Sequence, residues 1–139
     1  MSETPDNRFA GPAHALARIC LGLNIFLHGL VRIPHVGAFA GKLQHQFAET
    51  FLSPGLIQGS AYAIVAGETV IGLLVLLGLG LRGALIAGTL LMILLQLGTA
   101  LIQDWTVATQ QLIYVGFYVG LLATLRYDTC SLDRWRARP

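Results

Sequence analysis

The sequence predicts an all-α integral membrane protein: an antiparallel four-helix transmembrane bundle with an amphipathic interfacial helix between spans one and two. Two features of its composition predict this class. The 139 residues are 55% hydrophobic and only 12% charged, whereas an ordinary soluble domain carries about 25% charged residues. The apolar residues also gather into long runs, which is typical of membrane spans. A chain of this length forms a single domain.

Four segments have the ~20 residues that are needed to cross a hydrocarbon layer of ~30 Å. No charged residue lies between Arg82 and Asp104, or between Asp104 and Arg126. Short connections, such as the glycine-rich turn around Arg82, make the last three segments sequential antiparallel neighbours. The predicted spans of the domain at 13–126 are about 13–33, 56–80, 83–103 and 106–126.

The connection between spans one and two, about 34–55, has a pattern of its own. Its apolar residues recur at helical spacing, with polar residues largely on the opposite side. This pattern predicts an amphipathic helix on the outer membrane face. We interpret it as a lid over the bundle, with a gate or docking surface as the alternative. The apolar positions are Val36, Phe39, Leu43, Phe47 and Phe51.

The basic residues predict the orientation of the chain. Seven arginines lie on the side of both termini, against Arg32 and Lys42 on the other side. Cytoplasmic loops carry the excess of Lys and Arg, so both termini are expected in the cytoplasm of a bacterium or archaeon, below its inner membrane. Residues 1–12 lack the basic segment of a cleavable signal peptide and predict a disordered tail, and residues 127–139 predict a basic tail. The seven are Arg8, Arg18, Arg82, Arg126, Arg134, Arg136 and Arg138.

Glu68 is the only formally charged residue in the apolar run from Leu56 to Leu81. A carboxylate near the middle of a span costs roughly 2.5–3.5 kcal/mol on insertion scales. Such a residue marks a functional site by default and needs a partner inside the bundle. Glu68 is therefore the candidate proton relay of this protein.

Span one carries a polar stripe that faces one direction. At about 100° per residue, Arg18, Asn24, His28 and Arg32 fall within an arc of about 120°. Snorkelling to the two interfaces accounts for the two arginines, but not for Asn24 and His28. From the estimated depths we expect Glu68 to pair with Arg18 or with His28.

Spans three and four add polar seams, which we interpret mainly as interhelical hydrogen bonds. Tyr114 and Tyr118 are the exception, because they can line a pocket with His28 and Glu68. Gly22, Gly29, Gly67 and Gly72 allow close helix approach, and Gly116 and Gly120 form GxxxG for packing or for a dimer contact. The candidate ligand-binding residues are Arg18, Asn24, His28, Glu68, Tyr114 and Tyr118. Arg32 and Arg82 are candidates for structural pairing.

Several kinds of chemistry are not expected. Spans two to four contain no histidine, so a bis-histidine haem has no second ligand beside His28. The histidines are too scattered in depth for a metal site, and no HExxH, P-loop or GxGxxG occurs. Cys20 and Cys130 form no CxxC motif. The small formal charge of +2 indicates topology rather than a nucleic-acid partner.

Short motifs in spans one to three resemble the DoxX family over residues 14–103. They are Arg18-Ile-Cys-Leu-Gly22, then His28-Gly29-Leu30 and Arg32, then Glu68 with Gly72, Gly78 and Arg82-Gly83-Ala84. The resemblance implies a small four-helix membrane protein. Some relatives of this kind are membrane subunits of thiosulfate:quinone oxidoreductase, and others are associated with redox enzymes. The family-like positions are Arg18, His28, Gly29, Glu68 and Arg82, and Arg32 stands where the family often has lysine.

The leading hypothesis is a membrane subunit of a respiratory or sulfur-oxidising complex, which is not catalytic alone. It would anchor a soluble redox enzyme subunit and shelter a quinone, with His28, Tyr114 and Arg18 as donors and Glu68 as proton relay. The second hypothesis is a scaffold or assembly factor, in which a Glu68–Arg18 pair fixes the helix register. The third is a small transporter or proton-conducting module that acts as a homo-oligomer.

Overall fold

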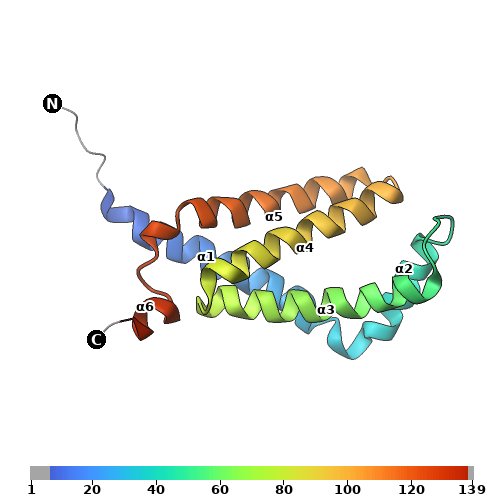
Figure 1. Ribbon diagram of the computed structural model, residues 1–139, viewed down its shortest axis with the longest axis horizontal. Coiled ribbons are helices and arrows are strands. Elements are labelled where there is room, and N and C mark those ends of the chain that lie inside the picture. Colours follow the sequence, from blue (N-terminus) through green and yellow to red (C-terminus); the bar gives the residue numbers. More distant parts are fainter. Residues whose placement is uncertain (1–6, 138–139) are drawn as a thin grey trace.

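The computed structural model describes residues 7–137, and every regular element within them is a helix (Figure 1). Four of the helices are long and apolar enough to cross a membrane, which confirms the predicted fold class. A separate helix lies between the first two long ones, as predicted, and a short helix follows the last. The helices are α1 (Ala10–Leu30), α2 (Val36–Gln46), α3 (Pro54–Leu77), α4 (Leu81–Leu101), α5 (Trp105–Ala123) and α6 (Leu132–Arg136).

The helix ends follow local chemistry. The first span begins and ends three residues earlier than predicted, at Ala10 and Leu30. Residues 7–12, which were expected to be disordered, are helical, and residues 1–6 lie outside the described residues. The hydroxyl oxygen of Ser53 accepts a hydrogen bond from the Leu56 amide at 3.3 Å and caps α3. Gly78 ends α3 in the left-handed region, at φ 67°, a conformation that glycine adopts without strain.

Glycines let α1 and α3 pack with their backbones in contact. A Cβ atom at Gly22 or Gly72 would overlap the backbone of the opposite helix, at Leu76 and Phe26 respectively, and one at Gly29 would overlap Thr69. In each of these pairs the two residue numbers add to 98, which defines the antiparallel register. The predicted role of these three glycines is confirmed. Gly67 differs, because its Cβ would make only an ordinary contact with the Leu91 side chain.

The helices α4 and α5 form a second pair, which is joined by the short turn between Leu101 and Trp105 and packs through a few specific contacts. The Tyr118 ring lies directly against Gly88 and is completely buried. The Thr99 hydroxyl donates to the Gln111 side-chain oxygen at 3.1 Å, which is one of the interhelical bonds predicted for the polar seams. The two pairs meet at the end that holds the chain termini and diverge toward α2 (Figure 1). There Phe47, just after α2, packs against Gly98 of α4 and links the pairs.

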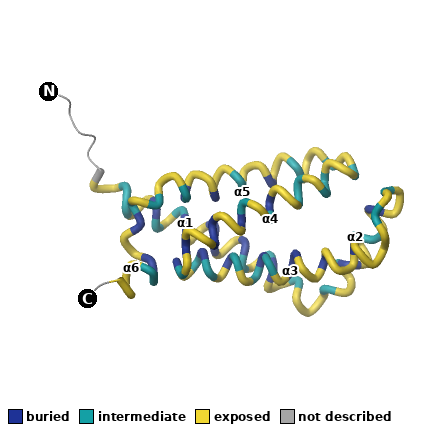
Figure 2. The backbone as a smooth tube through the Cα atoms, in the orientation of Figure 1, coloured by how far each residue is buried: buried dark blue, intermediate teal, exposed yellow. Residues whose placement is uncertain are grey.

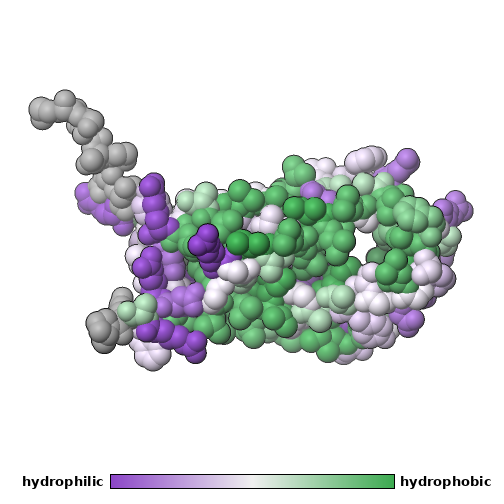
Figure 3. Space-filling view, in the orientation of Figure 1, coloured by the Kyte–Doolittle hydropathy of each residue, from purple (hydrophilic) through white to green (hydrophobic). Residues whose placement is uncertain are grey.

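The outer surface of the bundle is apolar, as a surface that contacts lipid must be. On the face seen in Figure 3, hydrophobic residues cover the long helices in a band, and polar residues gather at the two ends. The exposed positions lie along all four long helices (Figure 2). Leu90, Leu94 and Leu97 of α4 are each about 60% exposed or more, which would be unfavourable in water. These side chains therefore face the bilayer.

The C-terminal segment folds back onto the bundle. The Asp133 carboxylate accepts hydrogen bonds from the Gly80 and Leu81 amides, at 2.9 and 2.8 Å, and so caps α4. The Asp133 amide donates to the Gly78 carbonyl oxygen at 3.1 Å, and Ser131 is buried. The region predicted as a basic tail thus contains α6 and closes the turn between α3 and α4.

Candidate functional site

Glu68 pairs with Arg32. An Nη atom of Arg32 donates to a carboxylate oxygen of Glu68 at 2.5 Å, and the Glu68 side chain is only 6% exposed. The interpretation that Glu68 pairs with Arg18 or His28 is wrong. Arg32, which was proposed for structural pairing, is the residue that neutralises the buried carboxylate.

The register of α1 against α3 explains why Arg18 is not the partner. Since opposite residue numbers add to 98, position 30 of α1 lies level with Glu68. Arg18 is twelve residues away, which is ~18 Å along a helix. It instead donates to the Val75 and Leu76 carbonyl oxygens at the end of α3, at 2.9 and 2.6 Å. The depths expected from the sequence assumed that the midpoints of the two spans lie level, and the axial shift between α1 and α3 makes this assumption wrong.

Arg32 connects three elements. It follows the end of α1, it bonds Glu68 of α3, and its guanidinium lies 4.9 Å from the centroid of the Phe39 ring in α2. A cation over an aromatic face is attracted by the ring quadrupole. The Arg32 side chain is still 32% exposed. The guanidinium is thus fixed on two sides and accessible on another.

Asn24, His28 and Tyr114 form a second polar group beside this ion pair. The Tyr114 hydroxyl donates to the Asn24 side-chain oxygen at 3.0 Å, and the His28 and Tyr114 rings meet edge to face with centroids 6.3 Å apart. The Nδ1 atom of His28 lies 3.0 Å from the Asn24 backbone carbonyl. Because a carbonyl oxygen only accepts, Nδ1 is the protonated nitrogen, and Nε2 is the atom that can exchange a proton with a ligand.

An open cavity of about 420 Å³ lies against this face of α1. Its volume is within the range of about 300–1,000 Å³ that is typical of small-molecule sites. Tyr114, which reaches Asn24, is the central residue of α5, so the bond between these two side chains lies near the middle of the hydrophobic band, and His28 lies nearer the end of α1. The lining residues are Asn24, Leu27, His28, Val31 and Arg32.

Three of the predicted site residues lie elsewhere. Arg18 is at the end of the bundle near the termini, where its third bond goes to the Cys130 carbonyl oxygen at 3.3 Å. Tyr118 is buried against Gly88 and does not line the cavity. Arg82 is exposed on the first turn of α4 and has no ion-pair partner within residues 7–137. The proton-relay role of Glu68 remains a prediction.

A buried polar cluster near the termini was not predicted from the sequence. His14, Asp128 and Ser131 are each less than 7% exposed. His14 Nδ1 lies 3.0 Å from the Thr124 hydroxyl, and the Ser131 hydroxyl donates to Asp128. Only Ser131 carried a local signal, because a serine before Leu-Asp-Arg is typical of a helix N-cap. Across residues 7–137, no group of three or more His, Cys, Asp or Glu side chains is placed to hold a metal ion.

The helices and the intramembrane ion pair define a small polytopic membrane protein with four spans. The sequence model of the DoxX family matches residues 13–103, which is more than half of the chain. The chain therefore belongs to the DoxX family. No curated protein and no solved structure matches it significantly.

Proposed function

We propose that this DoxX protein is a membrane subunit of a redox complex in the bacterial or archaeal inner membrane, and that its α1 cavity binds a quinone head. The observation that carries the proposal is the polar wall formed by Asn24, His28 and Arg32, which line an open cavity along the second half of α1 and the turn that follows it. Polar groups within a span mark ligand pathways or substrate sites. A ligand that moves within the bilayer can reach them sideways.

The donors and acceptors of this wall fit a quinone ring. Arg32 keeps N–H groups beyond the one given to Glu68, and the Asn24 amide nitrogen is left as a donor because its oxygen accepts from Tyr114. These donors match the two ring carbonyl oxygens. His28 Nε2 would exchange the proton at one of these oxygens, and Glu68 would keep Arg32 charged and oriented. A bound quinone would accept two electrons from a soluble enzyme subunit and two protons, which would pass one after the other through His28 Nε2, with the imidazole reprotonated from the open side of the cavity.

The orientation of the chain supports a partner on the cytoplasmic side. Residues near both termini lie at one end of the bundle, as the His14–Thr124 contact shows. The basic residues Arg126, Arg134 and Arg136 are exposed at that end, and the positive-inside tendency supports a cytoplasmic position for it. This end would be the docking side for the soluble subunit.

A scaffold function is the alternative, and the Arg32–Glu68 pair favours it. The pair joins α1 to α3, and Phe39 joins α2 to the same guanidinium. Breaking such a pair from one side leaves a buried charge and costs about 3–5 kcal/mol. In this reading Arg32 serves packing alone and the cavity holds only lipid.

Quinone rebinding separates the two functions. The purified, quinone-depleted protein would be titrated with a short-chain ubiquinone and with a menaquinone analogue. The same titration would be made with three variants: Asn24→Ala, His28→Ala and the charge swap that combines Arg32→Glu with Glu68→Arg. Gln58→Ala, at an exposed position of α3, is the control. We expect Asn24→Ala and His28→Ala to lower affinity about tenfold each, as loss of one buried hydrogen bond to a ligand does, with Gln58→Ala unchanged.

The charge swap gives the decisive contrast. If Arg32 contacts the ligand, the swapped protein regains the thermal stability lost in Arg32→Glu alone but not its quinone affinity. If the pair is only structural, the swap restores stability and no variant changes quinone binding. The second result, or wild-type protein that binds no quinone, contradicts the proposed site.

A further inference from the structure

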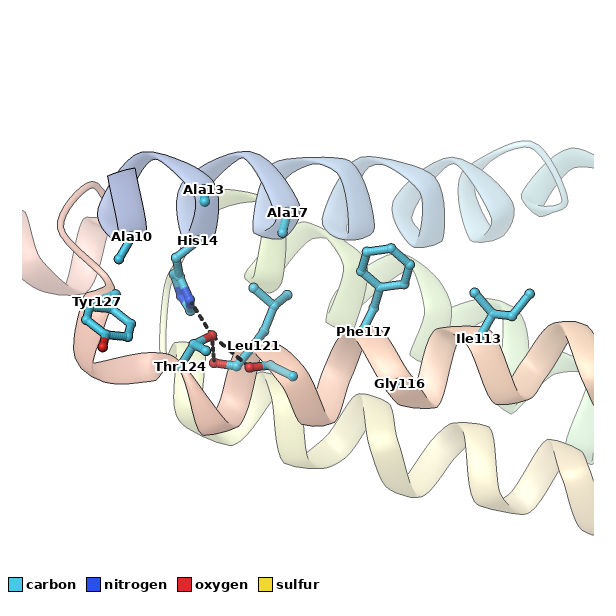
Figure 4. A pocket seen from close by; sticks show the side chains of 11 residues that line it. Ala10, Ala13, His14, Ala17, Ile113, Gly116, Phe117, Leu121, Thr124 and Tyr127 are labelled. Atoms are coloured by element: carbon cyan, nitrogen blue, oxygen red, sulfur yellow. Dashed lines mark hydrogen bonds between the residues drawn. The ribbon is translucent and has the colours of Figure 1, made fainter. Parts of the chain in front are cut away.

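A second hollow lies between α1 and α5, on the side of the chain termini (Figure 4). It is an open groove of about 540 Å³. Five of its eleven lining residues are small: Ala10, Ala13 and Ala17 from α1, with Gly116 and Gly120 from α5. A Cβ atom at Gly116 or Gly120 would meet nothing within 4 Å. The GxxxG motif therefore does not serve packing inside this bundle, and the groove it lines is open to an external molecule.

The length of the groove matches one leaflet of a bilayer. Along α5 it extends from Thr124 to Ile113, eleven residues or ~16 Å at the rise of an α-helix. Half of a ~30 Å hydrocarbon layer is ~15 Å. The groove thus runs from the boundary of the hydrophobic band to its middle.

The width of the groove fits a hydrocarbon chain better than a helix. Even all of the space between atoms in the groove and at its mouth, about 950 Å³, gives a mean cross-section of only roughly 59 Å² over ~16 Å. A helix with side chains is about 10 Å or more in diameter, so its cross-section is roughly 80 Å². A helix of a second copy could lie across the mouth of the groove but could not fill it.

The two ends of the groove differ in polarity. At the mid-membrane end the lining is apolar, with Ile113 and Phe117. At the other end His14 lines the groove and is only 4% exposed. The Thr124 hydroxyl donates to the Gly120 carbonyl oxygen at 2.7 Å, so it accepts from His14 Nδ1. His14 Nε2 has no hydrogen-bond partner within residues 7–137.

A cation stands beside this polar end. Tyr127 lines the groove, the Arg126 guanidinium lies 4.6 Å from the centroid of its ring, and an Arg126 Nη atom donates to its hydroxyl at 2.7 Å. The stacking places the guanidinium beside a residue that lines the groove and leaves most of its five N–H donors for another group. Arg guanidinium groups suit phosphate oxygens because several N–H donors lie in one plane.

We propose that this groove binds one acyl chain of an anionic phospholipid from the leaflet on the side of the chain termini, with the lipid phosphate beside Arg126. The chain fills the space over Gly116 and Gly120. The headgroup region reaches His14 and the guanidinium. The site is separate from the α1 cavity and does not depend on quinone binding there.

The test uses the full-length protein, delipidated in mild detergent and titrated with dioleoyl phosphatidylglycerol or dioleoyl phosphatidylcholine, with bound lipid counted by native mass spectrometry. Gly120→Leu and Gly116→Leu place a side chain in the groove, and the added Cβ atom meets nothing within 4 Å. Gly83→Leu is the matched control, since a Cβ there also meets nothing within 4 Å and Gly83 does not line the groove. Circular dichroism and thermal unfolding verify the folding of each variant.

We expect the wild type and Gly83→Leu to retain one phosphatidylglycerol. Displacing two or more methylene groups should weaken its binding at least about tenfold in Gly116→Leu and Gly120→Leu. Arg126→Gln should lower the preference for phosphatidylglycerol over phosphatidylcholine about fivefold. Equal binding by all variants would mean annular lipid only and overturns the proposal. Two other results would also overturn the proposal. One is that Gly116→Leu dissociates a dimer without any loss of bound lipid, and the other is that a quinone occupies the groove in place of phospholipid.

Discussion

At the scale of residues, the membrane-embedded polar side chains fall into two kinds. Arg32, Glu68, Asn24 and Tyr114 satisfy one another around an open cavity. Tyr118 is completely buried, and its hydroxyl has no hydrogen-bond partner within residues 7–137. An unsatisfied buried hydroxyl costs about 1–3 kcal/mol, whereas a bonded one is neutral or favourable. The same residue type therefore has opposite effects at positions 114 and 118.

The two tyrosines can be compared directly. Tyr118→Phe should leave thermal stability in detergent unchanged or raise it, because it removes a hydroxyl without a partner. Tyr114→Phe should lower stability by about 0.6 kcal/mol, the average value of a side-chain hydrogen bond in a membrane bundle. Quinone titration of the same proteins should show weaker binding in Tyr114→Phe alone, because Asn24 then loses its fixed orientation. Weaker binding in Tyr118→Phe would contradict the placement of this residue outside the cavity.

At the scale of elements, the close approach of α1 and α3 determines which residues meet. Gly22, Gly29 and Gly72 each face the backbone of the other helix. This contact sets the register that places Arg32 beside Glu68 and Arg18 at the end of α3. A displacement by one turn would separate the ion pair by ~5 Å. The glycines thus position the functional side chains without contacting them.

Gly72→Ala tests this contact. The added Cβ would overlap the Phe26 backbone, so α1 and α3 must separate. We expect a loss of about 1–3 kcal/mol, the usual cost of overpacking, measured as a lower unfolding temperature. Gly67→Ala in the same helix is the control, because its Cβ meets only the flexible end of Leu91 at 3.5 Å. A stability loss of the same size in both variants would indicate a general effect of the substitution rather than loss of the helix contact.

At the scale of the whole molecule, the C-terminal segment closes the bundle on the side of the termini. Arg18 bonds the end of α3 and the Cys130 carbonyl oxygen, and Asp133 caps α4. The hydrogen bonds from the Leu81 and Gly80 amides hold the pKa of Asp133 below its ordinary value of 3.8. The segment is thus an ordered part of the fold that couples α1, α3 and α4 to the surface where a soluble partner would dock.

Stability should therefore depend on Asp133 and on pH. The folded pKa of Asp133 is lowered, so its contribution is fully present above about pH 4, the ordinary range of aspartate, and is lost as the pH falls through the folded pKa. At neutral pH, Asp133→Ala should cost about 0.5–2 kcal/mol, as loss of a helix cap does. Below pH 4 the unfolding temperatures of the variant and the wild type should converge. The control Glu49→Ala, at an exposed position, should have the unfolding temperature of the wild type at every pH. If the unfolding temperature of Asp133→Ala stays below that of the wild type by the same amount at all pH values, the assigned role of the Asp133 carboxylate is contradicted.

The sequence by itself determined that this chain forms four apolar helices with a fifth between the first two, because span length and the spacing of apolar residues are local properties. It also marked Glu68, His28 and Asn24 as exceptional, since polar groups in apolar runs are unfavourable without partners. Only the tertiary structure decided which partners meet. Pairing depends on the axial offset between helices, and that offset is set by glycine contacts distributed over α1 and α3. The sequence also did not predict the ordered C-terminal segment or the groove beside Gly116 and Gly120. Both arise where residues about a hundred positions apart in the chain come together.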